Sequence, residues 1–485
     1  MKLAKLFHDL DITPAISREP VDISGISFHS GKVQPGHLFV AIKGYQVDGH
    51  QYIEDAIQKG AAAVIGEQEM EGLPVPYYRT GNARKALGKL ARAFYGNPAD
   101  KHILIGITGT NGKTTTSFMV RHILEYAGIS SALLGTVGYV INGKKQKTDN
   151  TTPDAVSLQK MLHDSKDEAV VMEVSSHGID QDRVGGEMFD YAVFTNLSHD
   201  HLDYHKSMEE YFEVKARLFE YMKDQGMAIV NRDCPWGRKL ADRLEGKGQS
   251  VSSFGSEPNN DTVLQEVVSL NGANFDILDK GELRHVKIPL PGKFNIENAT
   301  AAFLTARQIG VEPEVILEAL RCFPGVPGRF ETYRHPNGGK FIVDYAHTPS
   351  ALTVFLETIR SFEPVAVTHI FGFRGQRDLS KREEMVLSSI EHSDKVILTF
   401  DDLNGVPEEE MLSDLENLKG KAGPEKVSVI HDRTEAIQTA WNNAQEGEWV
   451  LITGKGPENY HNTFKIPASS DAELIKMLQK KQVRV

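Results

Sequence analysis

A glycine-rich turn at residues 109–116 is the segment of this chain with the clearest capacity for chemistry. It reads Gly-Thr-Asn-Gly-Lys-Thr-Thr-Thr, follows the apolar segment 103–107 and precedes a helical pattern at 118–124. Such a turn between a strand and a helix lets backbone N–H groups converge on phosphate oxygens. Lys113 adds a cation for the terminal phosphates, and the Thr114 hydroxyl is a ligand for Mg²⁺. The turn therefore predicts a nucleotide site, although it lacks the first glycine of the common P-loop pattern.

Glu173 stands near the end of a predicted buried strand at residues 169–174. A carboxylate at this position can hold Mg²⁺ opposite the nucleotide turn, because a hard cation takes oxygen ligands that it shares with phosphate. The alternative is a strand-end acid that pairs with a nearby lysine.

Three histidines and two aspartates lie within residues 196–205, again directly after a predicted strand. Zinc is one interpretation, but no cysteine accompanies the cluster and its histidine spacing fits no common zinc motif. A Mg²⁺ or phosphate site fits better, and a plain polar loop remains the alternative.

Lys215 shares one face of a predicted helix with Phe212, Leu218 and Phe219. A lysine within an apolar stripe is expected to be paired, neutral or modified. The alternative is a side chain that extends along the apolar surface until its ammonium reaches water.

Alternating strands and helices must position these residues, and 485 residues correspond to about three domains. Continuous apolar runs from residue 103 onward are typical of strands buried on both faces of a parallel sheet. Residues 261–290 instead alternate like hairpins, with a turn at Asn271-Gly272. Strands are expected at 38–42, 61–65, 103–107, 169–174, 191–195, 227–230, 341–345, 365–371, 395–399 and 449–453, and helices at 52–57, 118–124, 210–222 and 295–320.

A segment with two prolines and two glycines, residues 323–330, predicts the linker before a third, Rossmann-like unit. Arg329 at its end and Asp344 beyond it could close over ATP from two domains. Ligands of open α/β sheets bind at the carboxyl ends of the strands, so the segments 399–401 and 453–454 are further candidates.

Composition excludes several classes of protein. A net charge of −12 argues against nucleic acid as the main ligand. Two cysteines are too few for a disulfide framework and suit a reducing compartment. The chain shows no signal peptide and no apolar run of about 20 residues, so we expect a cytoplasmic protein without a membrane span.

These pieces, in this order, resemble the Mur ligases, the ATP-dependent amide ligases of peptidoglycan precursor synthesis. Within that family the chain is most similar to the UDP-N-acetylmuramoyl-tripeptide synthetases, which add the third peptide residue. The resemblance covers nearly the whole chain and rests on GTNGKTTT at 109–116, NTTP at 150–153, EVSSHG at 173–178, DHLDYH at 200–205, GKFNIEN at 292–298, PGRFE at 327–331 and DYAHTP at 344–349.

The resemblance implies an α/β fold with an N-terminal UDP-binding domain at 1–99, a central P-loop ATPase domain with a parallel sheet at 100–330 and a C-terminal Rossmann-like domain at 331–485. It implies ATP contacts from Gly109, Thr110, Asn111, Gly112, Lys113, Thr114, Thr115, Asn298, Arg329 and Asp344. Mg²⁺ ligands would be Thr114, Glu173, His201 and Lys215, with Lys215 carbamylated to N6-carboxylysine. Lys113, Lys215, His201 and Glu173 would carry the catalysis.

The implied substrates are ATP, UDP-N-acetylmuramoyl-dipeptide and a free amino acid, and we expect a monomer. Positions matching the UDP-substrate site are Ser30, Tyr45, Gln46, Asn150, Thr151, Thr152, Ser175, Gln181 and Arg183. Positions at or near the acceptor amino acid are Arg377, Asp401, Asp402, Asn404, Gly454 and Glu458. The substrate carboxylate would attack the γ-phosphate, and the amino group would then attack the resulting acyl phosphate while phosphate leaves.

The acceptor loop departs from the family pattern. Ligases that add meso-diaminopimelate carry Asp-Asn-Pro-Arg, whose arginine binds the distal carboxylate, whereas residues 401–404 here read Asp-Asp-Leu-Asn. An asparagine cannot replace a bidentate guanidinium at equal strength. We therefore expect an acceptor such as L-lysine, whose ammonium could meet Asp401 and Asp402. Arg374 is either a displaced cation for the acceptor or a solvated surface charge. The family's first-domain Asp-Ser-Arg is also altered, to His-Ser-Gly at 29–31.

Other functions stay open at this point. A paralogue acting on another UDP-peptide or amino acid fits the same motifs. A folylpolyglutamate-synthetase-like ligase would lack the first domain, and a plain kinase or GTPase would leave the later motifs unexplained. A nucleotide-binding scaffold that has lost catalysis is the alternative outside the enzymes, and retention of Lys113, Glu173, His201 and Lys215 argues against it.

Overall fold

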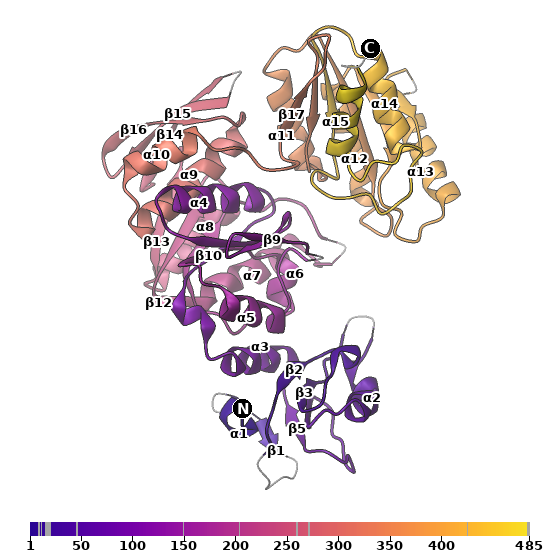
Figure 1. Ribbon diagram of the computed structural model, residues 1–485. Helices are drawn as coiled ribbons and strands as arrows, with labels where there is room; N and C mark the ends of the chain where they lie inside the picture. Colours follow the sequence, from indigo (N-terminus) through magenta and orange to yellow (C-terminus); the bar gives the residue numbers. More distant parts are fainter. Residues whose placement is uncertain are drawn as a thin grey trace.

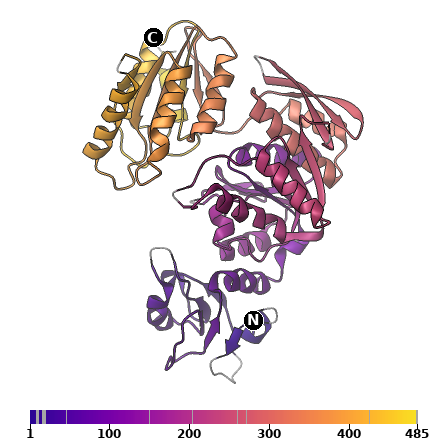
Figure 2. The ribbon, with the colours of Figure 1, turned by 180° about the vertical axis from the view of Figure 1, so that it is seen from behind.

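Three α/β units follow one another along the molecule, from the N-terminal unit at one end to the C-terminal unit at the other (Figures 1 and 2). The computed structural model describes the chain except for residues 8–9, 11, 15–20, 45–46, 149, 203, 259, 270–271, 424 and 483–485. The predicted three-domain α/β architecture is confirmed. The predicted turn at Asn271-Gly272 and the candidate residues Tyr45 and Gln46 lie wholly or partly outside the described residues.

The N-terminal unit is built on a sheet whose described strands run in the order β1-β5-β4-β3-β2. Its long helix α3 (Ala83–Phe94) begins where the Asn82 side chain accepts a hydrogen bond from the Lys85 amide, and it lies toward the central unit in Figure 1. The remaining elements are α1 (Leu3–Leu6), β1 (Ile12–Pro14), β2 (Gly25–Ser27), η1 (Ser30–Lys32), β3 (His37–Val40), η2 (Gly49–Tyr52), α2 (Ile53–Gln58), β4 (Ala63–Gly66) and β5 (Tyr77–Thr80).

The central unit contains the largest described sheet, in the order β16-β15-β14-β13-β12-β11-β6-β10-β7-β8-β9. Its middle strands are parallel and buried, as their continuous apolar sequences predict. The strands are β6 (Ile103–Thr108), β7 (Ser131–Gly135), β8 (Gly138–Ile141), β9 (Lys144–Gln146), β10 (Ala169–Glu173), β11 (Phe189–Phe194), β12 (Met222–Asn231), β13 (Ser250–Gly255), β14 (Thr262–Ser269), β15 (Gly272–Asp279) and β16 (Glu282–Ile288).

Helices cover both faces of the central sheet, which leaves one apolar core on each side. The predicted helix at 210–222 is shorter than expected, because the chain tightens into η4 and then enters β12 at Met222. No helix in the described part of the chain is long and apolar enough to cross a membrane. The elements are η3 (Pro98–Lys101), α4 (Lys113–Tyr126), α5 (Ala155–Asp164), α6 (Ser176–Asp180), α7 (Met208–Ala216), η4 (Arg217–Tyr221), α8 (Pro235–Gly246), α9 (Lys293–Ile309) and α10 (Pro313–Arg321).

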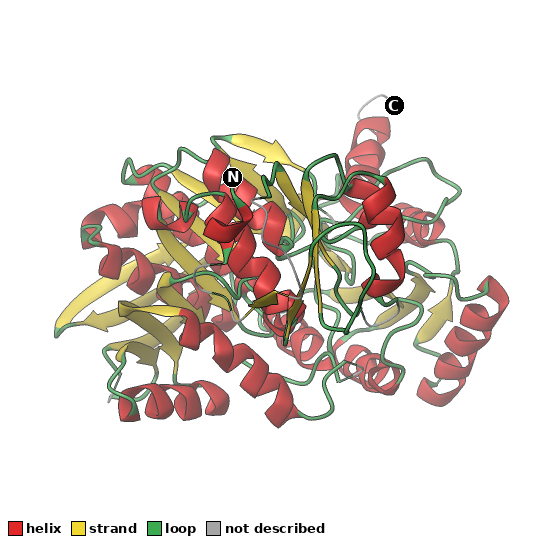
Figure 3. Ribbon diagram, turned by 90° about the horizontal axis from the view of Figure 1, so that it is seen from below, coloured by secondary structure: helices red, strands yellow, loops and turns green. Residues whose placement is uncertain are grey.

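The C-terminal unit has a sheet in the order β17-β18-β22-β19-β20-β21, parallel except for β17. Helices α11 to α13 cover one face of this sheet and α14 and α15 the other. Figure 3, coloured by secondary structure, shows helices around the strands of the molecule as a whole. The elements are β17 (Glu331–Arg334), β18 (Lys340–Val343), α11 (Pro349–Arg360), β19 (Ala366–Phe373), α12 (Ser380–His392), β20 (Lys395–Phe400), α13 (Glu408–Ala422), β21 (Val427–Val429), α14 (Arg433–Asn443), β22 (Glu448–Ile452) and α15 (Asp471–Gln482).

Strand order decides which loops meet. In the central sheet β11, β6 and β10 are neighbours, so the turns that follow them share one carboxyl edge. In the C-terminal sheet β18, β22, β19 and β20 are neighbours. The loops that carry the expected acceptor residues follow β22, β19 and β20. The linker packs against one of these segments, since a Cβ on Gly328 would lie 2.1 Å from the Pro457 nitrogen.

Candidate active site

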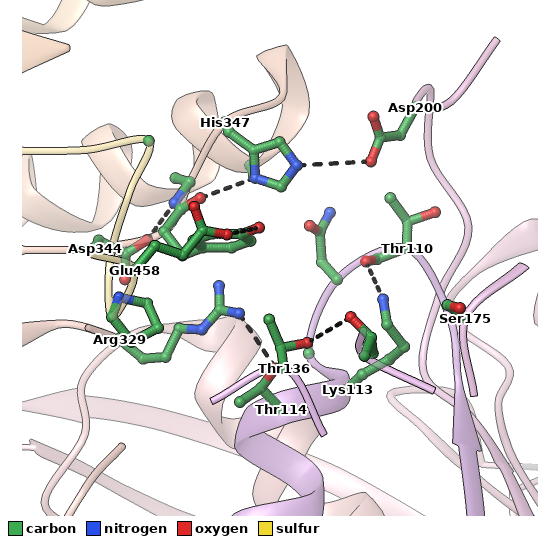
Figure 4. A pocket seen from close by; sticks show the side chains of 18 of the residues that line it. Thr110, Lys113, Thr114, Thr136, Ser175, Asp200, Arg329, Asp344, His347 and Glu458 are labelled. Carbon is green, nitrogen blue, oxygen red and sulfur yellow. Dashed lines mark hydrogen bonds and ion pairs between the residues drawn. The ribbon is translucent and has the colours of Figure 1, made fainter. Parts of the chain in front are cut away.

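A cavity of about 1110 Å³ is lined by residues of the central and C-terminal units. Figure 4 shows side chains from the nucleotide turn, from the linker and from the C-terminal loops converging on it. This volume exceeds the usual range of about 300–1,000 Å³ for a site that takes one small ligand. The cavity is therefore large enough for several substrates at once.

The nucleotide turn requires glycine at two positions. Gly109 has a φ of +146° and Gly112 a φ of +85°, and α4 starts directly after Gly112. A Cβ on Gly109 would lie 1.9 Å from the Thr195 hydroxyl, and one on Gly112 would lie 2.2 Å from the Asn298 side-chain oxygen. Close packing against these two neighbours explains why the glycines stand at these positions of the turn.

A half-buried lysine, Lys113, and a fully buried one, Lys215, donate to the same carbonyl oxygen. Lys113 Nζ lies 2.9 Å from the carbonyl oxygens of Gly109 and Thr110, and Lys215 Nζ lies 2.9 Å from that of Gly109. Burial lowers the pKa of Lys215 well below its usual range, and the neighbouring ammonium of Lys113 lowers it further. The alternative of a surface-reaching Lys215 is therefore wrong. Lys215 lies behind the turn and not in the cavity lining.

Glu173 has a fully buried side chain at the end of β10. Its carboxylate accepts hydrogen bonds from the Thr114 hydroxyl at 2.9 Å, and from the amide and hydroxyl of Thr136 at 3.0 and 2.9 Å. Thr136 follows β7 and was not expected from the sequence, because no motif surrounds it. Glu173 is thus bonded to the nucleotide turn, and hydroxyl and carboxylate oxygens together form a donor set suited to Mg²⁺.

His201 lies at the cavity wall with a φ of +54°, and its Nε2 is 3.4 Å from the Asp200 carboxylate. Burial lowers the pKa of this imidazole, although Asp200 opposes the shift, so the ring is neutral near pH 7 and able to bind a metal. Within the described residues, no three His, Cys, Asp or Glu side chains come together as a metal site of their own. A bound Mg²⁺ would thus need Thr114 and phosphate oxygens as well.

The linker reaches the nucleotide turn through Arg329, and Asp344 of the third unit lines the same cavity. The Arg329 guanidinium donates to the Thr114 hydroxyl at 3.2 Å and stacks 4.2 Å from the centre of the Tyr345 ring. The Asp344 carboxylate accepts from the amides of Phe330 and Ala346, both at 2.8 Å, and burial raises its pKa. Asn298 also lines the cavity.

The expected UDP-substrate residues of the central unit gather around Arg183. Its guanidinium donates to the Asn150 side chain at 3.1 Å, to the Thr152 carbonyl at 2.8 Å and to the Gln181 side chain at 3.0 Å. Thr152 is buried beneath the wall, whereas the others line the cavity together with Thr151 and Ser175. Ser30 lies in the N-terminal unit, outside this lining.

The expected acceptor residues divide into two groups. Arg377, Asp401, Gly454 and Glu458 line the cavity, whereas Asp402 and Asn404 do not. Asn404 has a φ of +49° and donates its side-chain amide to the Gly375 carbonyl at 3.1 Å. In this structure the turn directs Asp402 and Asn404 away from the cavity lining, so their contact with the acceptor stays a prediction.

Lys455 already binds the two aspartates that were expected to meet the acceptor's ammonium. Its fully buried Nζ lies 2.7 Å from Asp402 and 3.2 Å from Asp401. Arg374 lines the cavity, forms an ion pair with Glu458 and lies 3.8 Å from Asp401. Of the two interpretations of Arg374, the displaced cation is therefore supported and the solvated surface charge is wrong.

The comparison with known proteins identifies the same family in three successive parts of the chain. Residues 22–95 match the model described as Mur ligase family, catalytic domain; residues 107–306 match the Mur ligase middle domain; and residues 328–456 match the Mur ligase, glutamate ligase domain.

Two sequence relatives of nearly full coverage carry the same name. The UDP-N-acetylmuramoyl-L-alanyl-D-glutamate–2,6-diaminopimelate ligase of Phocaeicola vulgatus is 38% identical over 467 residues, 95% of each chain. That of Aquifex aeolicus is 38% identical over 460 residues, 94% of this chain and 93% of the relative. A solved structure of a ligase with this name aligns over 99% of each chain with a TM-score of 0.71 and 31% identity. The MurF ligase of Thermotoga maritima, solved in complex with ADP, shares the fold at 22% identity and a TM-score of 0.65, with 96% of this chain and 99% of that one covered.

Proposed function

Because this chain belongs to the Mur ligase family, as an ATP-dependent enzyme that forms an amide bond, we propose that it joins an L-lysine-like amino acid to UDP-N-acetylmuramoyl-L-alanyl-D-glutamate. Addition of the third amino acid to the UDP-linked dipeptide is the activity that the relatives support. The identity of the acceptor is the finer part of the proposal.

The observation that carries the proposal is the shared cavity. The nucleotide turn opens on one side of it, and Arg377, Gly454 and Glu458 line the other. A ligase of this kind must bring a phosphorylated carboxylate and an amino group together, and holding them in one cavity supplies the required proximity. Lys113 of the nucleotide turn would bind the phosphate that ATP transfers and so offset the charge that gathers during transfer.

The residues around Glu173 fit a divalent cation. Thr114, Glu173 and His201 would hold Mg²⁺, and when bound it would neutralise phosphate charge. Lys215 would take up CO₂ as N6-carboxylysine, with loss of one proton. Its burial and depressed pKa support this step, because the neutral amine is the form that reacts with CO₂.

Asn404 supports an acceptor without a distal carboxylate. Its amide is bonded to Gly375, and no guanidinium replaces it at that position. Asp401 and Asp402 share the ammonium of Lys455, so the lysine-like acceptor is supported by the missing arginine and not by a pair of free carboxylates.

The position of Arg374 favours a second candidate, meso-diaminopimelate. Arg374 lines the cavity beside Glu458 and could exchange that partner for the distal carboxylate of this acceptor. The relatives reported above are named for this amino acid.

A panel of amino acids tested with ATP and the UDP-linked dipeptide decides between these acceptors. L-Lysine as the best substrate, with Arg374→Gln leaving its kcat/KM within about twofold, supports the proposal. Selective use of meso-diaminopimelate, lost in Arg374→Gln, replaces it by the second candidate. Phosphate release that does not depend on any amino acid would instead support the scaffold alternative.

A further inference from the structure

Three successive residues of the central unit contact the C-terminal unit. The hydroxyls of Ser198 and Ser350 lie 3.1 Å apart, and His199 Nε2 lies 4.0 Å from the Asp378 carboxylate. The Asp200 carboxylate lies 3.7 Å from Lys381 Nζ and 4.0 Å from His347 Nε2. Figure 4 shows the side chains of Asp200 and His347 pointing toward each other. We call the residues Ser198, His199, Asp200, His347, Ser350, Asp378 and Lys381 the interdomain cluster.

The same segment is bonded to the nucleotide turn. The Thr110 amide donates to the Asn196 carbonyl at 2.8 Å, and the Asn111 amide donates to the Asn196 side chain at 3.0 Å. The Ser198 amide donates to the Thr110 hydroxyl at 3.1 Å. The segment therefore contacts the nucleotide turn on one side and the C-terminal unit on the other.

Lys381 is the main positive partner of Asp200 across the domains. The Asp200 side chain is 6% exposed and that of Lys381 is 17% exposed, so water screens this pair weakly. Burial lowers the pKa of His347 to about 4, which leaves its ring uncharged near pH 7. Lys381 also lies in the first turn of α12, where the helix dipole disfavours a cation. The negative charge of Asp200 offsets this unfavourable interaction.

We propose that Lys381 is a positioning residue, which through Asp200 holds the acceptor loops of the C-terminal unit against the nucleotide turn. Lys381 lies four residues after Arg377, at the start of the helix that follows the β19 loop. Movement of α12 away from Asp200 would carry Arg374 and Arg377 away from the nucleotide turn. This proposal rests on the proposed function, since it concerns the distance between acceptor and acyl phosphate.

Kinetics of Lys381→Gln give the first test. We expect kcat/KM for the amino acid to fall roughly 10- to 100-fold, as for a misplaced substrate, with KM for ATP changed less than about twofold. Lys381→Arg keeps the charge and should restore most of the loss. Lys395→Gln, an exposed lysine at the start of β20, is the matched control. Unchanged acceptor kinetics in Lys381→Gln would overturn the proposal.

A disulfide between positions 198 and 350 gives the second test. Cys234 and Cys322 are first replaced by serine. Hydroxyls 3.1 Å apart place two cysteine sulfurs near their bonding distance of about 2.05 Å, so Ser198→Cys with Ser350→Cys should crosslink on oxidation. Ser198→Cys with Ser361→Cys should not, because position 361 lies roughly 16 Å further along α11. The crosslink is read on a gel without substrates, so it is independent of the reaction assigned.

The two tests are then combined. Substrates are loaded before oxidation, and single-turnover product formation is measured in Lys381→Gln carrying the 198–350 disulfide. Recovery of most of the lost rate supports positioning, because the disulfide replaces the ion pair. A rate that stays low in the crosslinked protein overturns the proposal and assigns Lys381 a direct role on the reacting groups. Absence of a crosslink also overturns it. Wild-type turnover of ATP, measured separately, reports on the proposed function alone.

Discussion

Replacing Lys455 by methionine should destabilise the C-terminal unit strongly. The Lys455 ammonium is fully buried between Asp402 at 2.7 Å and Asp401 at 3.2 Å, and those side chains are only 5% and 3% exposed. Methionine fills a similar volume but leaves two buried carboxylates without their main partner. Breaking a buried ion pair in this way costs about 3–5 kcal/mol. For a domain of this size that corresponds to a Tm lower by roughly 6–20 °C.

The destabilisation caused by Lys455→Met should decrease as the pH is lowered. Burial opposes the charged form of Asp401, but Lys455, Arg433 and Arg374 outweigh it and hold its pKa below the ordinary value of 3.8. A depressed carboxyl pKa contributes stability above that ordinary value, and this contribution is lost as the pH falls through the folded-state pKa. In Lys455→Met the carboxylates of Asp401 and Asp402 lose the Lys455 ammonium. Protonation of these carboxylates at low pH removes the buried negative charge and so reduces the destabilisation. The difference in Tm between the two proteins should be largest near pH 7 and shrink below about pH 4.

Differential scanning calorimetry at several pH values measures both effects. Lys465→Met is the matched control, because the Lys465–Glu435 ion pair is exposed, and its Tm should match the wild type. Below its Tm, Lys455→Met should also bind the acceptor more weakly, since Gly454 and Asp401 line the cavity. An unchanged Tm at pH 7, or a decrease that is the same at every pH, would refute the reasoning.

Three further substitutions test the central unit. Glu173→Gln should lower ATP-dependent phosphate release by at least about 100-fold while Tm changes little, and near-normal release would exclude Glu173 from the metal site. Lys215→Ala should abolish ligation, with partial recovery on addition of short carboxylic acids; full activity without them would contradict carbamylation. Gly112→Ala should weaken binding of a fluorescent ADP analogue about tenfold or more, because its Cβ would lie 2.2 Å from the Asn298 oxygen at a φ of +85°. Unchanged ADP affinity would show that the turn tolerates a side chain.

Local sequence patterns were sufficient to predict the nucleotide turn and the strands around it. Continuous apolar runs identify β6 and β10, and strand order then brings Glu173 to the turn. The sequence leaves the burial of Lys215 open, because a helical stripe alone does not tell whether another element covers it. The Gly109 carbonyl, which accepts from Lys215, lies 106 residues away in sequence.

The contacts of the acceptor loop, residues 401–404, cannot be predicted from its own sequence. Two adjacent aspartates invite a cationic ligand, but their partner Lys455 lies more than 50 residues away. Asn404 also occupies a left-handed turn position, which asparagine tolerates well, so its identity reflects backbone geometry as much as recognition. Thr136 and Lys381 carry no motif, and only the packed structure indicates their contacts.

The division of the cavity between two sheet edges has a consequence for how such an enzyme diversifies. The nucleotide turn and Glu173 belong to the central sheet, whereas the residues at the acceptor end follow β19, β20 and β22 of another sheet. Under the proposed function, substitutions in these three loops should alter the choice of amino acid while the nucleotide turn and Glu173 stay in place. A new specificity can therefore arise by change, or even exchange, of the C-terminal unit alone, provided that Asp344 and the residues facing Ser198, His199 and Asp200 are kept.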